Sequence, residues 1–480
     1  MPHVETLPVP LRTIHVMGVA GTAMAALAGM LKDAGFSVTG SDQKVYPPMS
    51  DYLASLQIRV MEGYKASNLD HLPDLVVVGN VVRAVYEEAA SLTAGPIPYM
   101  SFPEVLGHLF LAQAHSVVVA GTHGKTTTTA ISAWLLESAG YNPGFLIGGL
   151  ARNFDRTARA GGGETFVIEG DEYDTAFFDK GPKFLHYRPK TVLLTSVEFD
   201  HADIYTDLDH VKQSFRSLLQ LIPHTGLLIA RGDDPNVASL LGEARCRVET
   251  YGPGQMWDGR IDGVDPVTGK MTFSVTRSGE PVLTARSSLV GPHNLYNQVA
   301  ATAMGIARGV PAAVLAAGFE TFQGIKRRQE VIGEPGTVTV IDDFAHHPTA
   351  VKVTIEALRL RFGKRRLWVV WEPRSATSRR SVFQEAYAEA FDGADQVVIA
   401  RPFDAGSLPT GDRFDADRLV TDLAGRGIDA VAMATADEIA QTVGVRAHPM
   451  DVVAIFSNGG FDGLHGKLLR LLDLRFGPTA

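Results

Sequence analysis

A short segment of the chain combines glycines, a lysine and threonine hydroxyls in one loop. Residues 121–127 read Gly-Thr-His-Gly-Lys-Thr-Thr. In such a loop Lys125 can neutralise the outer phosphates of a nucleoside triphosphate, and the Thr126 hydroxyl can ligate Mg²⁺. The full phosphate-loop pattern would place a glycine at position 119, where this chain has Val119, so the loop is a shortened variant. The predicted ATP-binding loop consists of Gly121, Thr122, His123, Gly124, Lys125, Thr126 and Thr127.

The residues on either side of this loop predict the strand and the helix that would hold it. A β-branched run at 117–119 precedes the loop, and apolar residues at helical spacing (Ile131, Trp134 and Leu135) follow it. At a strand–glycine–helix junction, backbone N–H groups and the positive end of the helix dipole converge on one point. We therefore expect nucleoside triphosphate binding. The alternative is a glycine turn that carries a surface lysine.

Acidic residues and a histidine follow two apolar runs farther along the chain. The run at 165–168 leads to Glu169, and the run at 191–197 leads to an Asp-His pair that ends in His201. In an open α/β sheet the carboxyl ends of the strands line the ligand crevice. We expect Glu169 and His201 to hold a second divalent cation. Carboxylates at strand ends also serve as helix caps or form salt bridges in loops. For any single one of these carboxylates, such a structural role is the alternative.

Residues 12–107 predict a separate nucleotide-binding unit. In order, the unit has a strand at 13–17, a glycine turn at 18–21, a helix at 22–34, and strands at 37–42 and 75–78. This order places a phosphate at the helix N-terminus and Asp42 beside a ribose or base. The turn lacks the complete G-x-G-x-x-G, so a nucleotide-linked substrate is allowed as well as a dinucleotide cofactor. As a further alternative, Gly18 and Gly21 only permit close packing of helix and strand.

Residues 324–480 predict a third α/β unit. Its expected strands lie at 337–341, 367–371, 396–400 and 451–456, and each ends in polar residues. This is the pattern of a doubly wound sheet that binds a second substrate at its strand ends. His346 and His347 stand in tandem, but no cysteine or further histidine stands at ligand spacing, so we expect no structural zinc. Before this unit, residues 250–290 alternate in short runs and predict small antiparallel strands.

Two asparagines stand at the start of a small-residue helix. Asn294 and Asn297 are three residues apart and share a helical face. Amide groups can read the edge of an adenine ring, so the pair is a candidate adenine contact. Helix capping is the alternative for both residues.

Length and composition indicate a globular protein of about three domains. The chain has 480 residues, of which 45% are apolar and 20% charged. We predict an α/β protein with three successive domains. They are a Rossmann-like N-terminal domain (1–107), a central P-loop ATPase domain with a mostly parallel sheet (108–323) and a Rossmann-like C-terminal domain (324–480).

Composition also disfavours several partners and locations. No apolar run approaches the ~18 to 20 residues of a membrane span, so we expect no membrane association. A net charge of −9 without a basic tract argues against broad nucleic-acid binding. The only cysteine, Cys246, cannot form an internal disulfide, and the first residues lack the basic and apolar regions of an export signal. We therefore expect a cytoplasmic protein, and the sequence carries no signal for its oligomeric state.

Together these motifs resemble those of the Mur ligases, the ATP-dependent amide-bond-forming enzymes of bacterial peptidoglycan synthesis. The resemblance covers nearly the whole chain. Its motifs are G-x-x-G with Ser41-Asp42, G-T-H-G-K-T-T-T from 121, E-x-D-E from 169, D-H at 200–201, H-N-x-x-N from 293, R-R at 327–328 and D-D-F-x-H-H-P-T from 342. It implies a UDP-sugar-binding N-terminal domain, a central ATPase and a C-terminal domain for an incoming amine. It also implies that ATP phosphorylates a muramyl carboxylate, and that the amine then expels phosphate from the acyl phosphate.

The resemblance assigns roles to the residues that match the family's motifs. Lys125 and Thr126 would hold phosphates and Mg²⁺, and Glu169 and His201 a second Mg²⁺. Arg328 would meet the γ-phosphate. The expected adenine contacts are His293, Asn294 and Asn297, and the expected ribose contact is Asp343. The expected UDP-sugar contacts are Gly18, Gly21, Ser41, Asp42 and Asn80, and the expected peptide contacts are Arg374 and Ser375, since a guanidinium binds a carboxylate bidentately.

The attacking amine must be neutral, so the reaction needs a general base. A histidine that ligates metal has no lone pair left for a proton, so His201 is unavailable as this base when it holds Mg²⁺, as the resemblance implies. His347 or an acid at 171–174 is our candidate.

Within the family, the motifs are most similar to the branch that activates UDP-N-acetylmuramate itself. Two motifs have the form that resembles family members attaching a murein tripeptide more than members attaching L-alanine. They are Glu198-Phe-Asp-His-Ala-Asp203 and Glu372-Pro-Arg-Ser375. The third residue of that peptide, meso-diaminopimelate or lysine, is left open. Members that add later residues carry a carbamylated lysine about fifteen positions after the Asp-His histidine; this chain has Arg216 there, so we expect no carbamate. The alternatives are L-alanine as the amine and a non-catalytic, nucleotide-binding regulatory module on the same fold.

Overall fold

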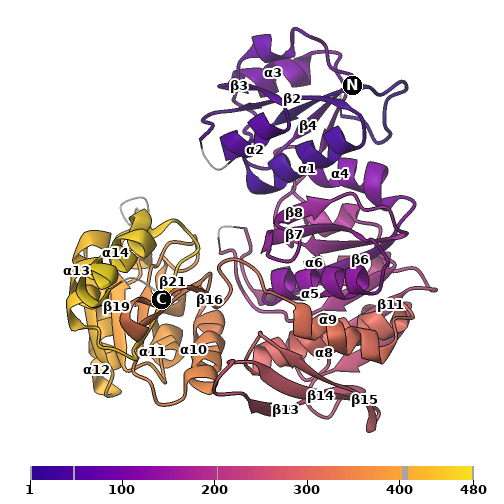
Figure 1. Ribbon diagram of the computed structural model, residues 1–480. Helices are drawn as coiled ribbons and strands as arrows, with labels where there is room; N and C mark the ends of the chain where they lie inside the picture. Colours follow the sequence, from indigo (N-terminus) through magenta and orange to yellow (C-terminus); the bar gives the residue numbers. More distant parts are fainter. Residues whose placement is uncertain (1–2, 47–48, 203, 403–408, 478–480) are drawn as a thin grey trace. The chain divides into compact units, whose positions relative to one another are not determined.

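The computed structural model describes residues 3–46, 49–202, 204–402 and 409–477. The chain forms two compact units (Figure 1). The first unit comprises residues 1–198, 208–258 and 299–318, and the second comprises residues 199–207, 259–298 and 319–480. Three separate sheets carry the α/β architecture that the sequence predicts. No helix within the described ranges is long and apolar enough to cross a membrane.

The first sheet has the strand order β3-β2-β1-β4-β5, and its strand pairs are all parallel. Its strands are β1 (Thr13–Met17), β2 (Ser37–Asp42), β3 (Arg59–Glu62), β4 (Leu75–Val78) and β5 (Tyr99–Ser101). The helices are α1 (Thr22–Asp33), α2 (Met49–Ser55), α3 (Glu87–Ala94) and α4 (Phe102–Leu106), with a 3₁₀ turn η1 (Ala66–Leu69) and a π-helical turn η2 (Gly107–Leu111). Figure 1 shows this sheet in indigo between α3 and the pair α1 and α2. The order reverses between β1 and β4, so a ligand crevice is expected at the carboxyl ends of these two strands.

Continuous apolar runs and small residues explain how this sheet packs. All four residues of β4 are buried, as is usual for a parallel strand that is covered on both faces. Helix α1 is rich in alanine, and a Cβ at its glycine, Gly29, would collide with the Tyr52 hydroxyl. The helix therefore lies close to α2. After β5 the chain forms two short helical segments in succession, α4 and η2.

The second sheet contains the P-loop strand. Within the first unit its order is β12-β11-β10-β6-β9-β7-β8, parallel except for the pair β7 and β8. The strands are β6 (His115–Ala120), β7 (Gly144–Ala151), β8 (Arg156–Arg159), β9 (Thr165–Gly170), β10 (Thr191–Leu194), β11 (Leu227–Arg231) and β12 (Arg247–Tyr251). The helices are α5 (Lys125–Ser138), α6 (Leu208–Leu221) and α7 (Pro235–Ala238), with 3₁₀ turns η3 (Lys183–His186) and η4 (Leu241–Glu243). The predicted mostly parallel ATPase sheet is thus present.

The strand predicted for 191–197 ends earlier, at Leu194. The Thr195 backbone N–H donates to the Ala120 carbonyl at 3.0 Å, and the Ser196 hydroxyl accepts from the His123 N–H at 2.9 Å. Beyond Leu194 the chain leaves the sheet, and the Ser196 hydroxyl there holds the P-loop backbone at His123.

The segment after β12 forms the antiparallel strands that its short alternating runs predict. Strand β13 (Trp257–Val264) begins with Trp257 beside Tyr251. In the second unit, β14 (Met271–Arg277) and β15 (Glu280–Ser287) form an antiparallel hairpin. Two helices follow, α8 (Pro292–Ala307) and α9 (Ala312–Thr321).

The third sheet lies in the second unit and has the order β16-β17-β21-β18-β19-β20, parallel except for the pair β16 and β17. Its strands are β16 (Glu330–Gly333), β17 (Thr339–Asp343), β18 (Leu367–Trp371), β19 (Gln396–Ala400), β20 (Asp429–Met433) and β21 (Val452–Phe456). The helices are α10 (Pro348–Phe362), α11 (Gln384–Ala390), α12 (Ala416–Gly425), α13 (Ala436–Arg446) and α14 (Leu464–Phe476). Short 3₁₀ turns are η5 (Pro335–Thr337), η6 (Ser381–Phe383), η8 (Thr410–Asp412) and η9 (Phe461–Gly463).

Helices cover both faces of this third sheet. One hydrophobic cluster joins it to α10, α11 and α12, and a second joins it to α13 and α14. This is the doubly wound arrangement that the sequence predicts. Two strands of this third sheet were not predicted, β16 and β20. They are the edge strands, and their half-exposed residues lack the continuous apolar run of the central strands.

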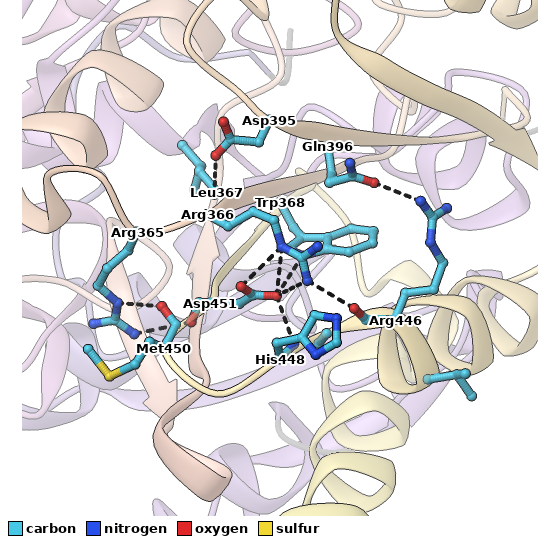
Figure 2. Close-up of polar contacts among 12 residues, drawn as sticks. Arg365, Arg366, Leu367, Trp368, Asp395, Gln396, Arg446, His448, Met450 and Asp451 are labelled. Carbon is cyan, nitrogen blue, oxygen red and sulfur yellow. Dashed lines mark hydrogen bonds and ion pairs between the residues drawn. The ribbon is translucent and has the colours of Figure 1, made fainter.

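An ion-pair network fixes the strand ends opposite the carboxyl edge of this sheet (Figure 2). Arg366, directly before β18, donates to the Asp451 carboxylate from Nε at 3.1 Å and from Nη2 at 2.6 Å. The same carboxylate accepts from the Trp368 indole at 3.0 Å and from the His448 N–H at 2.9 Å. Asp451 directly precedes β21, so the network locks β18 and β21 in register. Burial opposes ionisation, but the Arg366 hydrogen bonds outweigh it and lower the pKa of Asp451.

Candidate active site

The P-loop forms between β6 and α5, as the sequence predicts. Gly121 and Gly124 adopt φ values of +132° and +82°, which side-chain-bearing residues rarely adopt. A Cβ at Gly121 would also collide with the Thr195 hydroxyl. Helix α5 begins at Lys125, so the free N–H groups of its first turn face the loop. His123 also lies in the loop, with its Nε2 3.4 Å from the Glu198 carboxylate.

Lys125 is held inside the loop by a carbonyl and a carboxylate. Its ammonium donates to the Gly121 carbonyl at 2.6 Å and to the Glu172 carboxylate at 2.9 Å. The Glu172 side chain is 3% exposed, so this ion pair is buried. Burial disfavours the ammonium, but three nearby carboxylates, that of Glu172 foremost, outweigh burial and raise the pKa of Lys125. The lysine is therefore charged and faces a carboxylate where a phosphate could replace it.

Glu169 meets the start of α5 because β6 and β9 are neighbours in the sheet. In the register of this pair Glu169 lies opposite Val119. Val119 precedes Gly121, the first glycine of the loop, by two residues. Its carboxylate accepts from the Thr126 hydroxyl at 2.9 Å and from the Gly148 N–H at 2.7 Å. A Cβ at Gly148 would lie 2.7 Å from this carboxylate, so the glycine allows the approach. Burial, followed by the charge of Asp171, raises the pKa of Glu169.

A second lysine, which the sequence analysis missed, lies among the same acids. The Lys183 ammonium is 3.2 Å from the Asp171 carboxylate and 3.9 Å from the centre of the Tyr173 ring. Burial opposes ionisation of Asp171, but the charge of Lys183 outweighs it and lowers the pKa of Asp171. No motif marks Lys183, because it reaches the acids only when the chain returns through η3.

The predicted UDP-sugar residues lie at the carboxyl ends of β1, β2 and β4. Gly18 has φ +83°, and its N–H donates to the Ser41 carbonyl at 2.8 Å. The Asp42 carboxylate accepts from the Ala20 N–H at 2.9 Å and so braces the glycine turn. Gly21 is the N-cap of α1 at φ −68°, where other residues would also fit. The side chain of Asn80 is exposed just beyond β4.

The Ser41 side chain points into the core of the first sheet. Its hydroxyl is fully buried and donates to the Glu88 carboxylate at 2.9 Å. Glu88 also pairs with His15 at 2.8 Å and accepts from the Asn68 amide at 2.7 Å. Ser41 therefore presents its backbone to the glycine turn, while its hydroxyl belongs to this buried network.

In the second unit, Asp200 and His201 lie beside the third sheet. The Thr377 hydroxyl donates to the Asp200 carboxylate at 2.8 Å. Burial opposes ionisation, but the neighbouring histidines, His201 first, outweigh it and hold the pKa of Asp200 well below its usual range. His201 has φ +52°, a strained backbone conformation for a histidine and one that often marks functional positions.

The Asp343 carboxylate ends β17 and is buried. It accepts from the Gln329 N–H at 2.7 Å and from the Ala345 N–H at 2.8 Å. Burial raises the pKa of Asp343, and the charge of Arg328 opposes this effect. The Arg328 guanidinium lies 4.9 Å from the centre of the Phe344 ring. Both residues therefore lie at the carboxyl end of the same strand.

The predicted adenine residues lie in the first turns of α8. The Asn294 amide donates to the Val290 carbonyl at 2.9 Å, and the Asn297 amide donates to the Asn294 side-chain oxygen at 3.3 Å. The His293 ring lies 3.4 Å from the Gln329 amide. Asn294 and Asn297 are buried, and their amide NH₂ groups donate in these hydrogen bonds. The two residues share the helical face that their spacing predicts.

His347 caps helix α10. Its Nδ1 accepts from the Thr349 N–H at 3.3 Å, and its Nε2 lies 3.3 Å from the Phe199 carbonyl. The bond from Thr349 requires an unprotonated Nδ1, and a bond to the Phe199 carbonyl requires a proton on Nε2. A general base needs a free lone pair, so His347 would first have to release Thr349.

Arg374 lies where β18 and β21 end. Its guanidinium donates to the Glu372 carboxylate at 3.2 Å, and the Ser457 hydroxyl donates to the same carboxylate at 2.5 Å. A Cβ at Gly459 would collide with the Arg374 side chain. The Ser375 hydroxyl is engaged with Ser378 at 2.9 Å. The predicted peptide residues therefore lie at the carboxyl edge of the third sheet, Arg374 partly exposed.

Comparisons with known proteins agree with this architecture. Residues 13–114 match the model described as Mur ligase family, catalytic domain; residues 119–305 match the Mur ligase middle domain; and residues 327–459 match the Mur ligase, glutamate ligase domain. A UDP-N-acetylmuramate–L-alanyl-γ-D-glutamyl-meso-2,6-diaminoheptandioate ligase of Escherichia coli K12 is 39% identical over 95% of this chain and 97% of its own. A UDP-N-acetylmuramate–L-alanine ligase of an Anaeromyxobacter species is 33% identical over 96% and 98%. The crystal structure of a murein peptide ligase from Psychrobacter arcticus covers 96% of this chain and 98% of its own, with a TM-score of 0.70 and 32% identity. This chain therefore belongs to the Mur ligase family.

Proposed function

We propose that the protein is an ATP-dependent ligase of murein recycling. It joins the lactyl carboxylate of UDP-N-acetylmuramate to the amine of L-alanyl-γ-D-glutamyl-meso-diaminopimelate and releases ADP and phosphate. The observation that carries this proposal is the partly buried group formed by Lys125, Thr126 and Glu169. A charged lysine, a hydroxyl and a carboxylate meet there at the start of a helix, which is what phosphoryl transfer from ATP requires.

The residues present fit a Mg²⁺–ATP complex. The Thr126 hydroxyl and the Glu169 carboxylate offer hard oxygen ligands 2.9 Å apart, and Gly121 and Gly124 leave room for phosphates against the backbone. A bound Mg²⁺ would neutralise charge on the phosphate oxygens. His201, Arg328 and Asp343 are our further proposed ATP and metal contacts, on the resemblance of their motifs.

The first chemical step is a transfer of the γ-phosphoryl group. An oxygen of the lactyl carboxylate bonds to the γ-phosphorus, and the bond from that phosphorus to the bridging oxygen breaks, with its electron pair leaving on ADP. Lys125 contributes by neutralising charge on the phosphate oxygens as this bond breaks. Its exchange of Glu172 for a phosphate keeps the ammonium paired throughout.

The second step forms the amide bond. The amine nitrogen attacks the acyl carbon, phosphate leaves, and the nitrogen loses a proton to a base. Our candidate bases are His347 and the acids at 171–174. The proposed peptide contact is Arg374, whose guanidinium is held by Glu372 at the carboxyl edge of the third sheet.

Phosphate release with ATP and Mg²⁺ tests this function. UDP-N-acetylmuramate is supplied with the tripeptide in one reaction and with L-alanine in another. We expect turnover with the tripeptide, and turnover with L-alanine alone would assign the protein to the alternative amine. Lys125→Met should lower turnover by roughly 100-fold or more, because it removes a charge at the transferred phosphate. Lys180→Met is the matched control, since Lys180 forms an exposed ion pair in the same segment.

The alternative of another class is a nucleotide-binding regulatory module. Such a module would bind ATP and UDP-N-acetylmuramate without releasing phosphate in the presence of any amine. Binding of both nucleotides with no turnover would therefore support the regulatory reading and overturn the ligase proposal.

A further inference from the structure

Lys183 is a buried lysine that the proposed mechanism does not use. It is the first residue of η3, and its side chain is 9% exposed. Its ammonium lies between the Asp171 carboxylate, 3.2 Å away, and the face of the Tyr173 ring, 3.9 Å from the ring centre. Lysines are rarely this buried, because removing the ammonium from water costs free energy that a partner must offset.

The charges around the P-loop form two lysine–acid pairs. Lys125 pairs with Glu172, and Lys183 pairs with Asp171. Glu169 is held separately by a hydroxyl and a backbone N–H. Under the proposed function, a phosphate replaces Glu172 on Lys125 when ATP binds. By the same chemistry, an incoming carboxylate can replace Asp171 on Lys183 without leaving the ammonium unpaired.

The segment that carries Lys183 runs from the acids near the P-loop to the first sheet and back. After the acids, the chain reaches the hydrophobic cluster of the first sheet, where Phe177 and Phe178 pack. The Phe178 ring lies 4.9 Å from that of Tyr99 in β5. The chain then returns, and Lys183 reaches Asp171. A UDP-sugar on the glycine turn after β1 must extend its lactyl group to the γ-phosphate at Lys125, and this segment spans the same two places.

We propose that Lys183 is the cation that binds the lactyl carboxylate of UDP-N-acetylmuramate, an inference that rests on the proposed function. The carboxylate takes the place of Asp171 on the ammonium. Lys183 keeps its proton during phosphoryl transfer. It remains beside the acyl phosphate when the new bond from oxygen to phosphorus has formed and ADP has left.

UDP-N-acetylglucosamine is the probe that isolates this contact, because it lacks the lactyl group and is otherwise the same nucleotide sugar. Binding of both compounds is measured by calorimetry in the absence of ATP. We expect the wild-type protein to prefer UDP-N-acetylmuramate. Lys183→Met should weaken binding of UDP-N-acetylmuramate by roughly 10- to 100-fold and binding of UDP-N-acetylglucosamine by less than about 2-fold. Lys183→Arg, which keeps the charge, should retain part of the preference.

Two controls separate this role from a structural one. Lys180→Met removes a lysine from the same segment that pairs with Asp174 at 2.9 Å but is 69% exposed, and it should leave the preference unchanged. The double variant Asp171→Asn with Lys183→Met removes both buried charges, so it leaves neither charge unpaired. If Lys183 only neutralises Asp171, the double variant should regain the preference. If Lys183 binds the lactyl carboxylate, it should not.

The outcomes distinguish this inference from the function on which it rests. A Lys183→Met protein that still prefers UDP-N-acetylmuramate overturns the lysine assignment, while tripeptide turnover by the wild-type protein would leave the function intact. A wild-type protein that binds neither nucleotide sugar overturns both. If Lys183→Met does not fold, the Arg variant and the double variant decide the question by the same two binding measurements.

Discussion

The Lys125 ammonium lies 2.9 Å from the Glu172 carboxylate, in a pair whose two side chains are 11% and 3% exposed. The P-loop lysine thus rests on an acid that comes from the segment after β9. The Glu172 carboxylate accepts a hydrogen bond from the Lys125 ammonium, as an oxygen of a bound phosphate would. The pair therefore ties the P-loop lysine to the acidic segment that follows β9.

Replacing Glu172 with glutamine should make the stability of the protein more dependent on ATP. The change leaves Lys125 buried without its main partner, and we expect unfolding to become easier by roughly 3 kcal/mol. ATP supplies a new partner, so it should restore more stability to the variant than it adds to the wild type. Denaturant unfolding with and without Mg²⁺–ATP measures both effects. Asp174→Asn, which breaks an exposed pair, is the control and should change stability by less than about 1 kcal/mol.

Replacing Glu169 with glutamine should abolish most turnover and leave the fold intact. The amide oxygen can still accept from the Thr126 hydroxyl or the Gly148 N–H, but the negative charge is lost. We expect phosphate release to fall by roughly 100-fold and to need more Mg²⁺. Glu164→Gln, an exposed change just before β9, is the control. Unchanged turnover in Glu169→Gln at low Mg²⁺ would remove this residue from the metal site.

His115 should make the protein less stable as the pH falls below neutrality. The Arg308 guanidinium lies 3.2 Å from its Nδ1, and the Thr191 hydroxyl lies 2.9 Å from its Nε2, so the ring is held neutral. Burial first, and then the charge of Arg308, lowers the pKa of His115 to about 4. An unfolded histidine has a pKa of about 6.5, so the unfolded state binds more protons between these values. The contribution of His115 is therefore complete above pH ~6.5 and is lost as the pH falls toward 4.

Thermal unfolding between pH 4 and 7 tests this dependence. His115→Gln should show a shallower loss of stability over that range than the wild type, because glutamine does not titrate. His224→Gln, at an exposed position, should keep the wild-type slope. An equal slope in all three proteins would show that His115 does not contribute.

Asp451 should contribute stability that acid removes. Its pKa is lowered, mainly by Arg366 acting against burial, so its contribution is complete above the unfolded value of about 3.9 and is lost as the pH falls through the folded value. We expect Asp451→Asn to lower the free energy of unfolding by roughly 2–3 kcal/mol at pH 7. The difference from wild type should shrink in acid. Asp462→Asn, whose carboxylate is 81% exposed, is the control for this measurement.

The sequence by itself determined the local chemistry of this protein. Gly121 and Gly124 adopt the positive φ values that the loop pattern implies, and the continuous apolar runs form the central parallel strands. These features can be predicted from a few consecutive residues, because a glycine's backbone freedom and the apolar pattern of a central strand are properties of the local sequence. The edge strands β16 and β20 escaped prediction, because strands at an edge are half exposed and carry a weaker pattern.

Only the tertiary structure decided which side chains meet. It paired Lys125 with Glu172, turned the Ser41 hydroxyl into the core beside Glu88, and returned Lys183 to Asp171. These contacts join residues that are 12 to 47 positions apart. They depend on the order of strands in a sheet and on which charges that order buries together. The spacing of residues along the chain contains neither the strand order nor the set of charges buried together. The motifs therefore predicted that acids lie at the strand ends, but only the packing determined which residues they contact.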